Sequence, residues 1–576
     1  HRTEYRYDKL NRRIEVKDAN NGVSRMGYDK VGNMLTRTDA LNHTTSFTYD
    51  ALNRQKVITD ALNHSTTIAY DAVGNILATT DALNHTTSFN YDNLNRRIAT
   101  IDALGQTQSI TYDKIGNVLT ATDELGHVTS YGYDSLDRQT SITDPLGHIS
   151  STSYDTEGNV LTTTDELNHT TTYSYDLNHR LVKSKDALNQ QWSISYDLVG
   201  NIGSFTDELG RTTTYTYDAI ERRTAITDAL GHATTYSYDA VGNRTKVADA
   251  LNQTTKYVYD SLNRQIKVID AKNGITTTGY DAVGNIQSIT DSVGNTTSYT
   301  YDALNRWITD TNSLGKTRSY GYDAVGELIS EIDRNGRKRT YDYDALNRET
   351  AEHWLDNVGT DIRTFSYSYD AVGHLLSTND PDSKYTYTYD KVDRIASVDN
   401  LGTSGVPNVL MNYSYDAAGN LLSVTDKING VLKGTNAYTY DILNRVTRLT
   451  QSGTGVTDKR VDMSYDAASQ MTGLNRYGDL AGTLSVANTS YTYDLAGRLT
   501  DLKHQRGATT LASYGLAYDA ANRITKSEGT DGIQDYTYDT TNQLTGASHT
   551  TQTNEAYSYD ANGNRTSGGS GTGTNN

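Results

Sequence analysis

The chain has 576 residues, a formal net charge of −18 from 52 Lys and Arg against 70 Asp and Glu, and no cysteine. This acidic balance argues against a nucleic-acid partner and against insertion into or binding to an anionic membrane, since such surfaces select clustered Lys and Arg. No apolar run approaches the roughly 18 residues of a membrane span, and the absence of cysteine excludes disulfides and thiolate chemistry. The 45 tyrosines, against four Phe and three Trp, predict a thin and partly wet fold, because buried phenols need hydrogen-bond partners.

A Tyr-Asp pair recurs along the whole chain. The pairs follow one another every 21 residues from Tyr7 to Tyr343, and nine further pairs, from Tyr369 to Tyr559, are spaced less regularly. A fixed period of this size is typical of a repeat architecture that grows by adding units.

Each 21-residue unit contains the same turn pattern twice: an Asp, any residue, an apolar residue, and then Asn or Gly. Asp can bond the backbone amide two residues on, and Asn or Gly tolerates the positive φ that ends such a hairpin turn. The residues that we expect to form this structural signature, taken from one pair of units, are Tyr49, Asp50, Asn53, Asp60, Asn63, Tyr70, Asp71, Gly74 and Asn75.

Short segments of alternating polar and aromatic residues separate the turns, as in Ser46–Tyr49 and Ser298–Tyr301. This period of two predicts strands, so the fold class is all-β: a repetitive antiparallel β-hairpin ribbon with two strands per repeat of about 21 residues. Open sheets rarely exceed about ten strands without curling, so we expect the ribbon to spiral into a hollow shell or tube.

A longer period and a change of regularity divide the chain. The first turn alternates between Leu-Asn-Arg and Val-Gly-Asn, which gives a 42-residue super-repeat; this indicates either two environments for successive hairpins or growth by duplication of pairs. We predict regular repeats over 1–349, irregular repeats with longer loops over 350–566, and a flexible Gly/Ser/Thr/Asn tail over 567–576. Because His1 already lies inside a repeat, we expect the sequence to be part of a longer protein.

The motif Tyr-Asp-x-x-Gly-Asn, at Tyr70–Asn75, Tyr238–Asn243 and Tyr559–Asn564, resembles the YD or RHS repeats. That family includes Rhs polymorphic toxins, the B/C components of Tc toxins, wall-associated bacterial proteins and teneurins. The resemblance implies a hollow shell of spiralling hairpins, which in toxin members holds a C-terminal effector released by self-cleavage. The proline-containing core motif of the toxins is missing, since only Pro145, Pro381 and Pro407 occur, and no autoproteolytic aspartate can be transferred to this chain.

The repeated Asp and His residues do not predict chemistry by spacing alone. Asp50 and Asp60 should lie at opposite strand ends, roughly 20 Å apart, beyond the 5–10 Å of a glycosidase pair. Histidines recur at one turn position, where neighbours about 9.6 Å apart are too distant to share a metal ion, and we interpret them as solvated turn residues. These histidines are His43, His64, His85, His127, His148, His169 and His232. We therefore assign no catalytic, metal or cofactor site.

The sequence favours a non-enzymatic structural scaffold of a secreted or cell-surface bacterial protein, whose hollow shell or tube could encapsulate an effector domain. The alternative is an extracellular filament or a surface adhesion protein, whose partners would be cell-surface glycans or further copies joined end to end. Exposed tyrosine rows could stack on sugar rings, although packing along the ribbon is the simpler use of cross-strand aromatic pairs.

Overall fold

The computed structural model describes residues 2–566, and every regular element in that range is a β-strand. The 51 strands form one sheet, in which each strand pairs antiparallel with the next, from β1 (Glu4–Tyr7) to β51 (Glu555–Ala556). This confirms the all-β meander with two strands per repeat. The tail predicted for 567–576 lies outside the described residues.

The strands of the first part follow one rule up to β33 (Lys338–Tyr343), apart from the four-residue β1. A six-residue strand ends on the tyrosine of each Tyr-Asp pair, as in β5 (Thr44–Tyr49) and β7 (Ser65–Tyr70). A five-residue strand, such as β6 (Gln55–Thr59), then begins six residues after that tyrosine. Every such pair carries a bulge beside the tyrosine, as between Thr48 and Tyr49. The 21-residue period of the sequence therefore corresponds to one pair of strands in the sheet.

After β33 the strands vary from five to ten residues, apart from the two-residue β51. Part of the added length that the sequence assigned to loops therefore lies in longer strands. The strands of this section are β34 (Glu349–Leu355), β35 (Asp361–Tyr369), β36 (Leu375–Asn379), β37 (Lys384–Tyr389), β38 (Ile395–Asp399), β39 (Val409–Tyr415), β40 (Leu421–Ile428), β41 (Val431–Tyr440), β42 (Val446–Ser452), β43 (Lys459–Tyr465), β44 (Met471–Tyr477), β45 (Ser485–Tyr493), β46 (Leu499–Arg506), β47 (Thr509–Tyr518), β48 (Ile524–Gly529), β49 (Gly532–Tyr538) and β50 (Leu544–His549).

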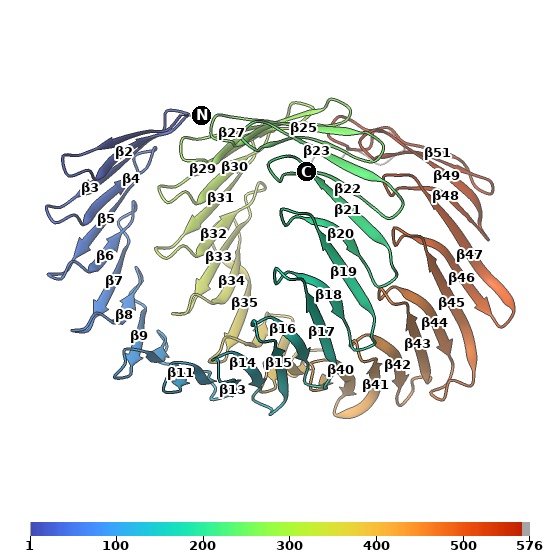
Figure 1. Ribbon diagram of the computed structural model, residues 1–576. Coiled ribbons are helices and arrows are strands. Elements are labelled where there is room, and N and C mark those ends of the chain that lie inside the picture. The colour runs from blue at the N-terminus through green and yellow to red at the C-terminus, as the bar shows by residue number, and fades with distance from the viewer. Residues whose placement is uncertain (1, 567–576) are drawn as a thin grey trace.

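The sheet winds as an open spiral (Figure 1). The first winding descends on the left through β5 and β7, passes β16 (Val160–Thr164) at the bottom and rises to β25 (Thr254–Tyr259) at the top; the second descends again and returns through β40 and β49. Residues that face each other across the windings are 240 to 279 positions apart. A winding therefore holds roughly 25 strands, which at about 4.8 Å each gives a circumference of about 120 Å and a diameter of about 40 Å.

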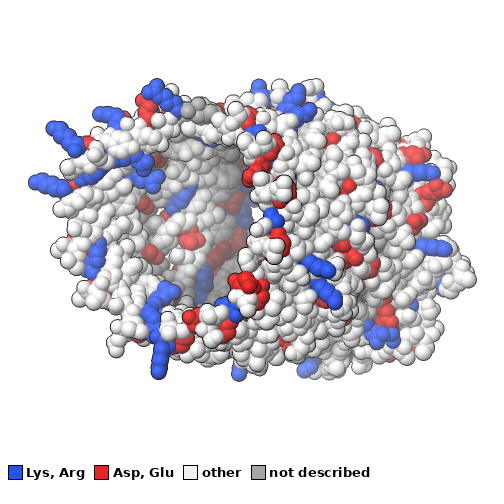
Figure 2. Space-filling view, in the orientation of Figure 1, with Lys and Arg blue, Asp and Glu red and all other residues white. Residues whose placement is uncertain are grey.

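The space inside this wall is hollow, as Figure 2 shows on its left side, where the interior is visible past the rim. Few apolar side chains are available to fill it, because the only buried apolar residues among those described are Ala248 and Ala547. The prediction of a hollow shell is confirmed. Residues 2–566 contain no helix of the length and apolar character that a membrane span needs.

The two faces of the ribbon differ in chemistry. Phe47 lies opposite Ile58 on one face, and the tyrosines of the Tyr-Asp pairs share that face by the two-residue period of a strand. On the other face hydroxyls pair directly across strands, as between Thr111 and Thr120 at 2.6 Å. Half-buried aromatic rows and ladder hydrogen bonds thus take the place of a thick dry core.

One carboxylate organises most of the hairpin turns. Asp50 Oδ1 accepts hydrogen bonds from the backbone amides of Leu52 at 2.8 Å and Arg54 at 3.0 Å. The chain reverses over Asn53, whose φ of 60° lies in the left-handed region. At the other strand end Asp60 and Asn63, with φ of 69°, repeat the same turn. The positive φ that the sequence predicted at Asn53 and Asn63 is confirmed.

Gly74 occupies a different conformation from the asparagine that it replaces. Its φ is 106°, and its amide donates to Asp71 Oδ1 at 2.7 Å, whereas the Asn53 amide donates to the Asp50 carbonyl oxygen. Asn reaches the left-handed region near 60° but not this one, which is nearly restricted to glycine. The two residue types are therefore less interchangeable than the sequence pattern suggested.

We expect Gly74→Ala to destabilise its hairpin by roughly 1–3 kcal/mol, because any Cβ is strained at this φ although open space surrounds it. Asn53→Gly should cost about 1 kcal/mol or less, since glycine adopts the left-handed region freely and only the exposed hydrogen bond from Asn33 Nδ2 is lost. Hydrogen exchange in peptides covering residues 44–80 measures both effects. Equal loss of protection in the two variants would contradict the distinction between the turns.

Candidate functional site

In turns of the Leu-Asn-Arg type, the arginine joins one repeat to the next. Arg54 Nε donates to Asp50 Oδ2 at 2.7 Å, and Nη1 donates to the carbonyl oxygen of Asp71, 2.8 Å away in the following Tyr-Asp turn. Its guanidinium carbon lies 4.6 Å from the centroid of the Tyr70 ring, within cation–π distance. The same forward link recurs at Arg12, Arg96, Arg138, Arg222, Arg264 and Arg306.

The Tyr-Asp tyrosines link repeats in the opposite direction. The Tyr49 hydroxyl donates to the carbonyl oxygen of Met34 at 2.9 Å, and the Tyr70 hydroxyl donates to that of Gln55 at 2.8 Å. Each acceptor lies 15 residues earlier, on the preceding hairpin. These half-buried phenols therefore find the partners that their burial requires.

Turns of the Val-Gly-Asn type use an amide for the forward link. Asn75 Nδ2 donates to Asp71 Oδ2 at 2.8 Å within its own turn and to Asn95 Oδ1 at 2.9 Å in the next Tyr-Asp turn. Arginine links and asparagine links thus alternate along this edge of the ribbon. Successive hairpins occupy two environments, which gives the 42-residue super-repeat a physical meaning.

Histidines organise many turns at the opposite edge. His64 donates its amide to Asp60 Oδ1 at 2.9 Å, and its Nδ1 lies 3.1 Å from Asp60 Oδ2. The His64 side chain is only 28% exposed. His64 is a turn residue as expected, but it is only partly solvated, because its ring is hydrogen-bonded to the carboxylate of its own turn. The same pairing holds at His43, His127, His148, His169 and His232.

The two edges of the ribbon meet where the windings stack, and we call this contact the seam. In each contact the earlier winding supplies a turn of the Asp60 type and the later winding supplies a Tyr-Asp turn. The hydrogen bonds across the seam join Asn20 to Asp260, Asn444 to Asp165, Arg211 to Gln470, Lys272 to Asp539 and Asn562 to Asp291. Polar groups therefore join the windings at these points, beside apolar turn residues such as Ile442 and Leu443.

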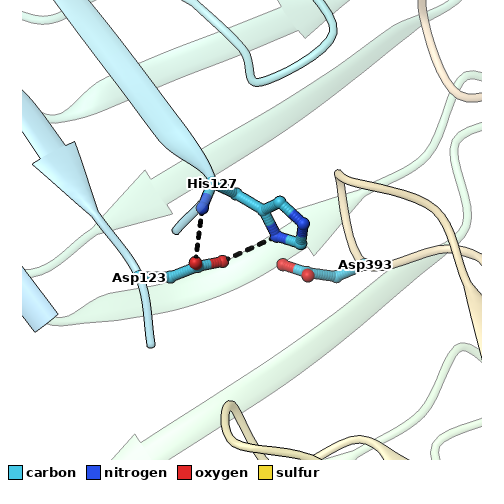
Figure 3. A group of neighbouring side chains, drawn as sticks. All are labelled: Asp123, His127 and Asp393. Carbon is cyan, nitrogen blue, oxygen red and sulfur yellow. Dashed lines mark hydrogen bonds and ion pairs between the residues drawn. The ribbon is translucent and has the colours of Figure 1, made fainter. Parts of the chain in front are cut away.

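The seam also gathers a cluster of possible metal ligands (Figure 3). Asp123 accepts from the His127 amide at 2.7 Å and lies 2.9 Å from His127 Nδ1, while Asp393 approaches the same imidazole from the next winding. One potential ligand atom from each of the three residues lies within 4.8 Å of the others. Sequence spacing could not find this cluster, because Asp393 reaches it only through the winding of the sheet.

Hydrogen bonding shifts the acidity of the turn residues. The Arg54 amide and guanidinium lower the pKa of Asp50 against the opposing effect of desolvation. Two arginines, Arg460 first and Arg448 second, lower the pKa of Asp462 to about 2, although burial works against them. Burial raises the pKa of Tyr341 to about 12, with nearby glutamates adding to the effect. At neutral pH these carboxylates are therefore ionised acceptors, and the phenol is a neutral donor.

Sequence reasoning placed the nine signature residues in turns and strand ends, where the structure also has them. It missed Arg54, the main partner of Asp50, although an Arg after Leu-Asn in alternate repeats was the available signal. The arrangement fixes backbone geometry and joins repeats. The turn carboxylates accept hydrogen bonds from donors in their own loops.

We expect Arg54→Ala to destabilise the repeats on both sides by about 1–2 kcal/mol, because it removes charge-assisted hydrogen bonds and a cation–π contact. Arg54→Lys should recover only part of this loss, since an ammonium lacks the planar fork. Hydrogen exchange over residues 44–80 reports the change. Lys56→Ala, at an exposed position of β6, is the matched control and should alter protection little; an equal effect there would refute the link.

Acid should unfold the shell only well below neutrality. A carboxyl group whose folded pKa is lowered contributes stability that is complete above its unfolded pKa and is lost as the pH falls through the folded value. For Asp462 this window runs from 3.8 down to about 2. Denaturant unfolding between pH 6 and pH 2 should show stability falling below about pH 4, and Asp462→Asn should flatten that fall. A loss of stability already complete at pH 5 would contradict this assignment.

The comparison with solved structures gives one match of similar architecture and further, weaker ones. The chain is similar to the crystal structure of TcdB2-TccC3-Cdc42, with 12% identity and a TM-score of 0.57, over 96% of this chain and 40% of that one. It is also similar to TcdB2-TccC3, with 13% identity and a TM-score of 0.45, over 97% and 41% of the two chains. The chain spans about two fifths of the length of those chains. The first comparison establishes likeness of fold.

No curated protein matches the chain. The family model described as RHS Repeat matches residues 28–64, 70–107, 112–149, 154–191, 196–233, 222–254, 238–275, 280–317, 322–353, 369–404 and 415–457. Together these segments cover more than half of the 576 residues. The repeated turn pattern, the spiral ribbon and these matches agree, and the chain belongs to the RHS Repeat family.

Proposed function

We propose that this chain is the non-enzymatic wall of a container for a passenger polypeptide, in particular an effector domain C-terminal to the repeats of a longer, secreted or cell-surface bacterial protein. The observation that carries the proposal is the hollow spiral itself: one continuous sheet surrounds a space that its own side chains do not fill. A backbone diameter of about 40 Å leaves room for a small domain of about 30 Å.

The chemistry of the repeats supports this container role. The signature residues Tyr49, Asp50, Asn53, Asp60, Asn63, Tyr70, Asp71, Gly74 and Asn75 serve as structural residues, because their polar atoms bond within or between turns. The regular section 1–349 and the irregular section 350–566 serve as successive stretches of one wall, since the ladder passes without interruption from β33 to β34. The resemblance to toxin shells favours an effector as the passenger.

A fusion experiment tests the enclosure. A small single-domain passenger is placed after Asn576, and the same passenger before His1 is the control. If the shell encloses the C-terminal passenger, small-angle X-ray scattering should give the maximum dimension of the unfused chain. The N-terminal fusion should be longer by up to about 30 Å, the diameter of the added domain.

Equal lengthening of both fusions would refute enclosure. Concentration-dependent growth into fibres, or binding of the unfused chain to immobilised cell-surface glycans without passenger retention, would instead favour the filament or adhesion alternative.

A further inference from the structure

The cluster at the seam combines residues from two windings. Asp123 and His127 belong to one turn at the edge of the first winding, where Asp123 Oδ2 lies 2.9 Å from His127 Nδ1. Asp393 belongs to the Tyr-Asp turn that begins at Asp390 on the second winding. In Figure 3 the two carboxylates approach the imidazole from either side. The three side chains converge on one point between the windings.

A cavity of about 440 Å³ opens at this point, and its lining is strongly acidic. Asp123, Glu124, Asp144 and Asp393 bring four carboxylates to the lining, while Lys391 brings one ammonium group. Because carboxylates outnumber cationic groups in this lining, the local charge is negative, and a cation is attracted into the cavity. The volume admits an ion together with water molecules that complete its coordination.

A neighbouring histidine holds Asp393 in position. His374 Nε2 lies 3.3 Å from Asp393 Oδ1, and the His374 ring stacks on Tyr389 with centroids 4.4 Å apart. Supporting contacts of this kind orient ligands and strengthen metal sites. Asp393 therefore approaches the seam with its carboxylate already oriented.

We propose that Asp123, His127 and Asp393 bind a divalent first-row transition ion such as Zn²⁺, which fastens the first winding to the second. Potential ligand atoms within 4.8 Å of one another need only a small closure to meet an ion at bond lengths of about 2.0–2.2 Å. The imidazole favours a transition ion over Ca²⁺ or Mg²⁺, which prefer sites made of oxygen alone. Two carboxylates and one imidazole leave coordination positions for water.

The repeat itself supplies conservative replacements. Glutamine stands at the His127 position in other turns, where the Gln106 amide still donates to Asp102 Oδ1 at 2.9 Å. Asparagine stands at the Asp393 position, as Asn53 does, and it tolerates the φ of 67° found at Asp393. His127→Gln and Asp393→Asn should therefore retain their turns while removing one ligand each.

His169 provides the matched control. It makes the same turn as His127, with Nδ1 3.0 Å from Asp165 Oδ2. The residue that faces it across the seam is Asn444, whose amide lies 3.5 Å from Asp165 Oδ2, so the second winding offers no carboxylate there. His169→Gln removes an equivalent imidazole from an equivalent seam position without touching the proposed site.

Isothermal titration of Zn²⁺ into the chelator-treated full chain tests the proposal, with Co²⁺ absorption as a second probe. We expect about one equivalent bound by the wild type and by His169→Gln. His127→Gln and Asp393→Asn should each weaken binding by at least roughly tenfold, since even supporting contacts change metal affinity by that factor. Zn²⁺ should raise the Tm of the wild type and of His169→Gln more than that of the two ligand variants.

Absence of Zn²⁺ binding by the wild type would overturn the proposal. Unchanged affinity in Asp393→Asn, with circular dichroism of the native fold, would also overturn it, because the ion would then be held by one turn alone. Loss of binding in His169→Gln would equally count against this site. None of these outcomes depends on a passenger polypeptide, so the experiment tests the metal site separately from the proposed container function.

Discussion

The structure depends on the aspartate carboxylate that recurs at the start of its hairpin turns. In the turn of Asp50, Oδ1 accepts from two backbone amides of the loop and Oδ2 accepts from the side chain of Arg54 after the reversal, and most turns repeat this use of an Asp. Because these bonds lie within five residues, hairpins of this kind are specified locally and can form before their neighbours. The register of the ladder follows from the turns, since a slip of one residue would place Phe47 on the hydroxyl face.

Local hairpins become one wall through links that always reach to the adjacent repeat. Arg54 reaches forward to Asp71, Asn75 reaches forward to Asn95, and Tyr70 reaches back to Gln55. Nearest-neighbour coupling of this kind is what makes repeat proteins quasi-one-dimensional. It also allows stability without a thick core, since half-buried rings and arginines cover one another along the ribbon.

Local periodicity explains what the sequence could and could not predict. The turns, strands and open spiral follow from patterns within 21 residues, as Asn53 and Asp50 illustrate. Arg54 was missed although Asp50 lies in its own turn, and its second partner, the carbonyl oxygen of Asp71, lies beyond that turn in the following repeat. The seam was inaccessible for a stronger reason: the separation of facing residues varies from 240 to 279, so no fixed period relates Asn20 to Asp260 or Asp165 to Asn444. That offset is set by the accumulated twist of the sheet, which no single repeat encodes.

Two kinds of contact of unequal strength therefore hold the ribbon together. Along the ladder every strand shares backbone hydrogen bonds with its neighbours, whereas across the seam the windings meet through side chains such as Arg211 and Gln470. Contacts of this kind are made one side chain at a time, and they lack the continuous backbone hydrogen bonding of the ladder. Separating the windings would leave the ladder of backbone hydrogen bonds intact, whereas a break within the sheet would not, so the seam is the easier of the two connections to open.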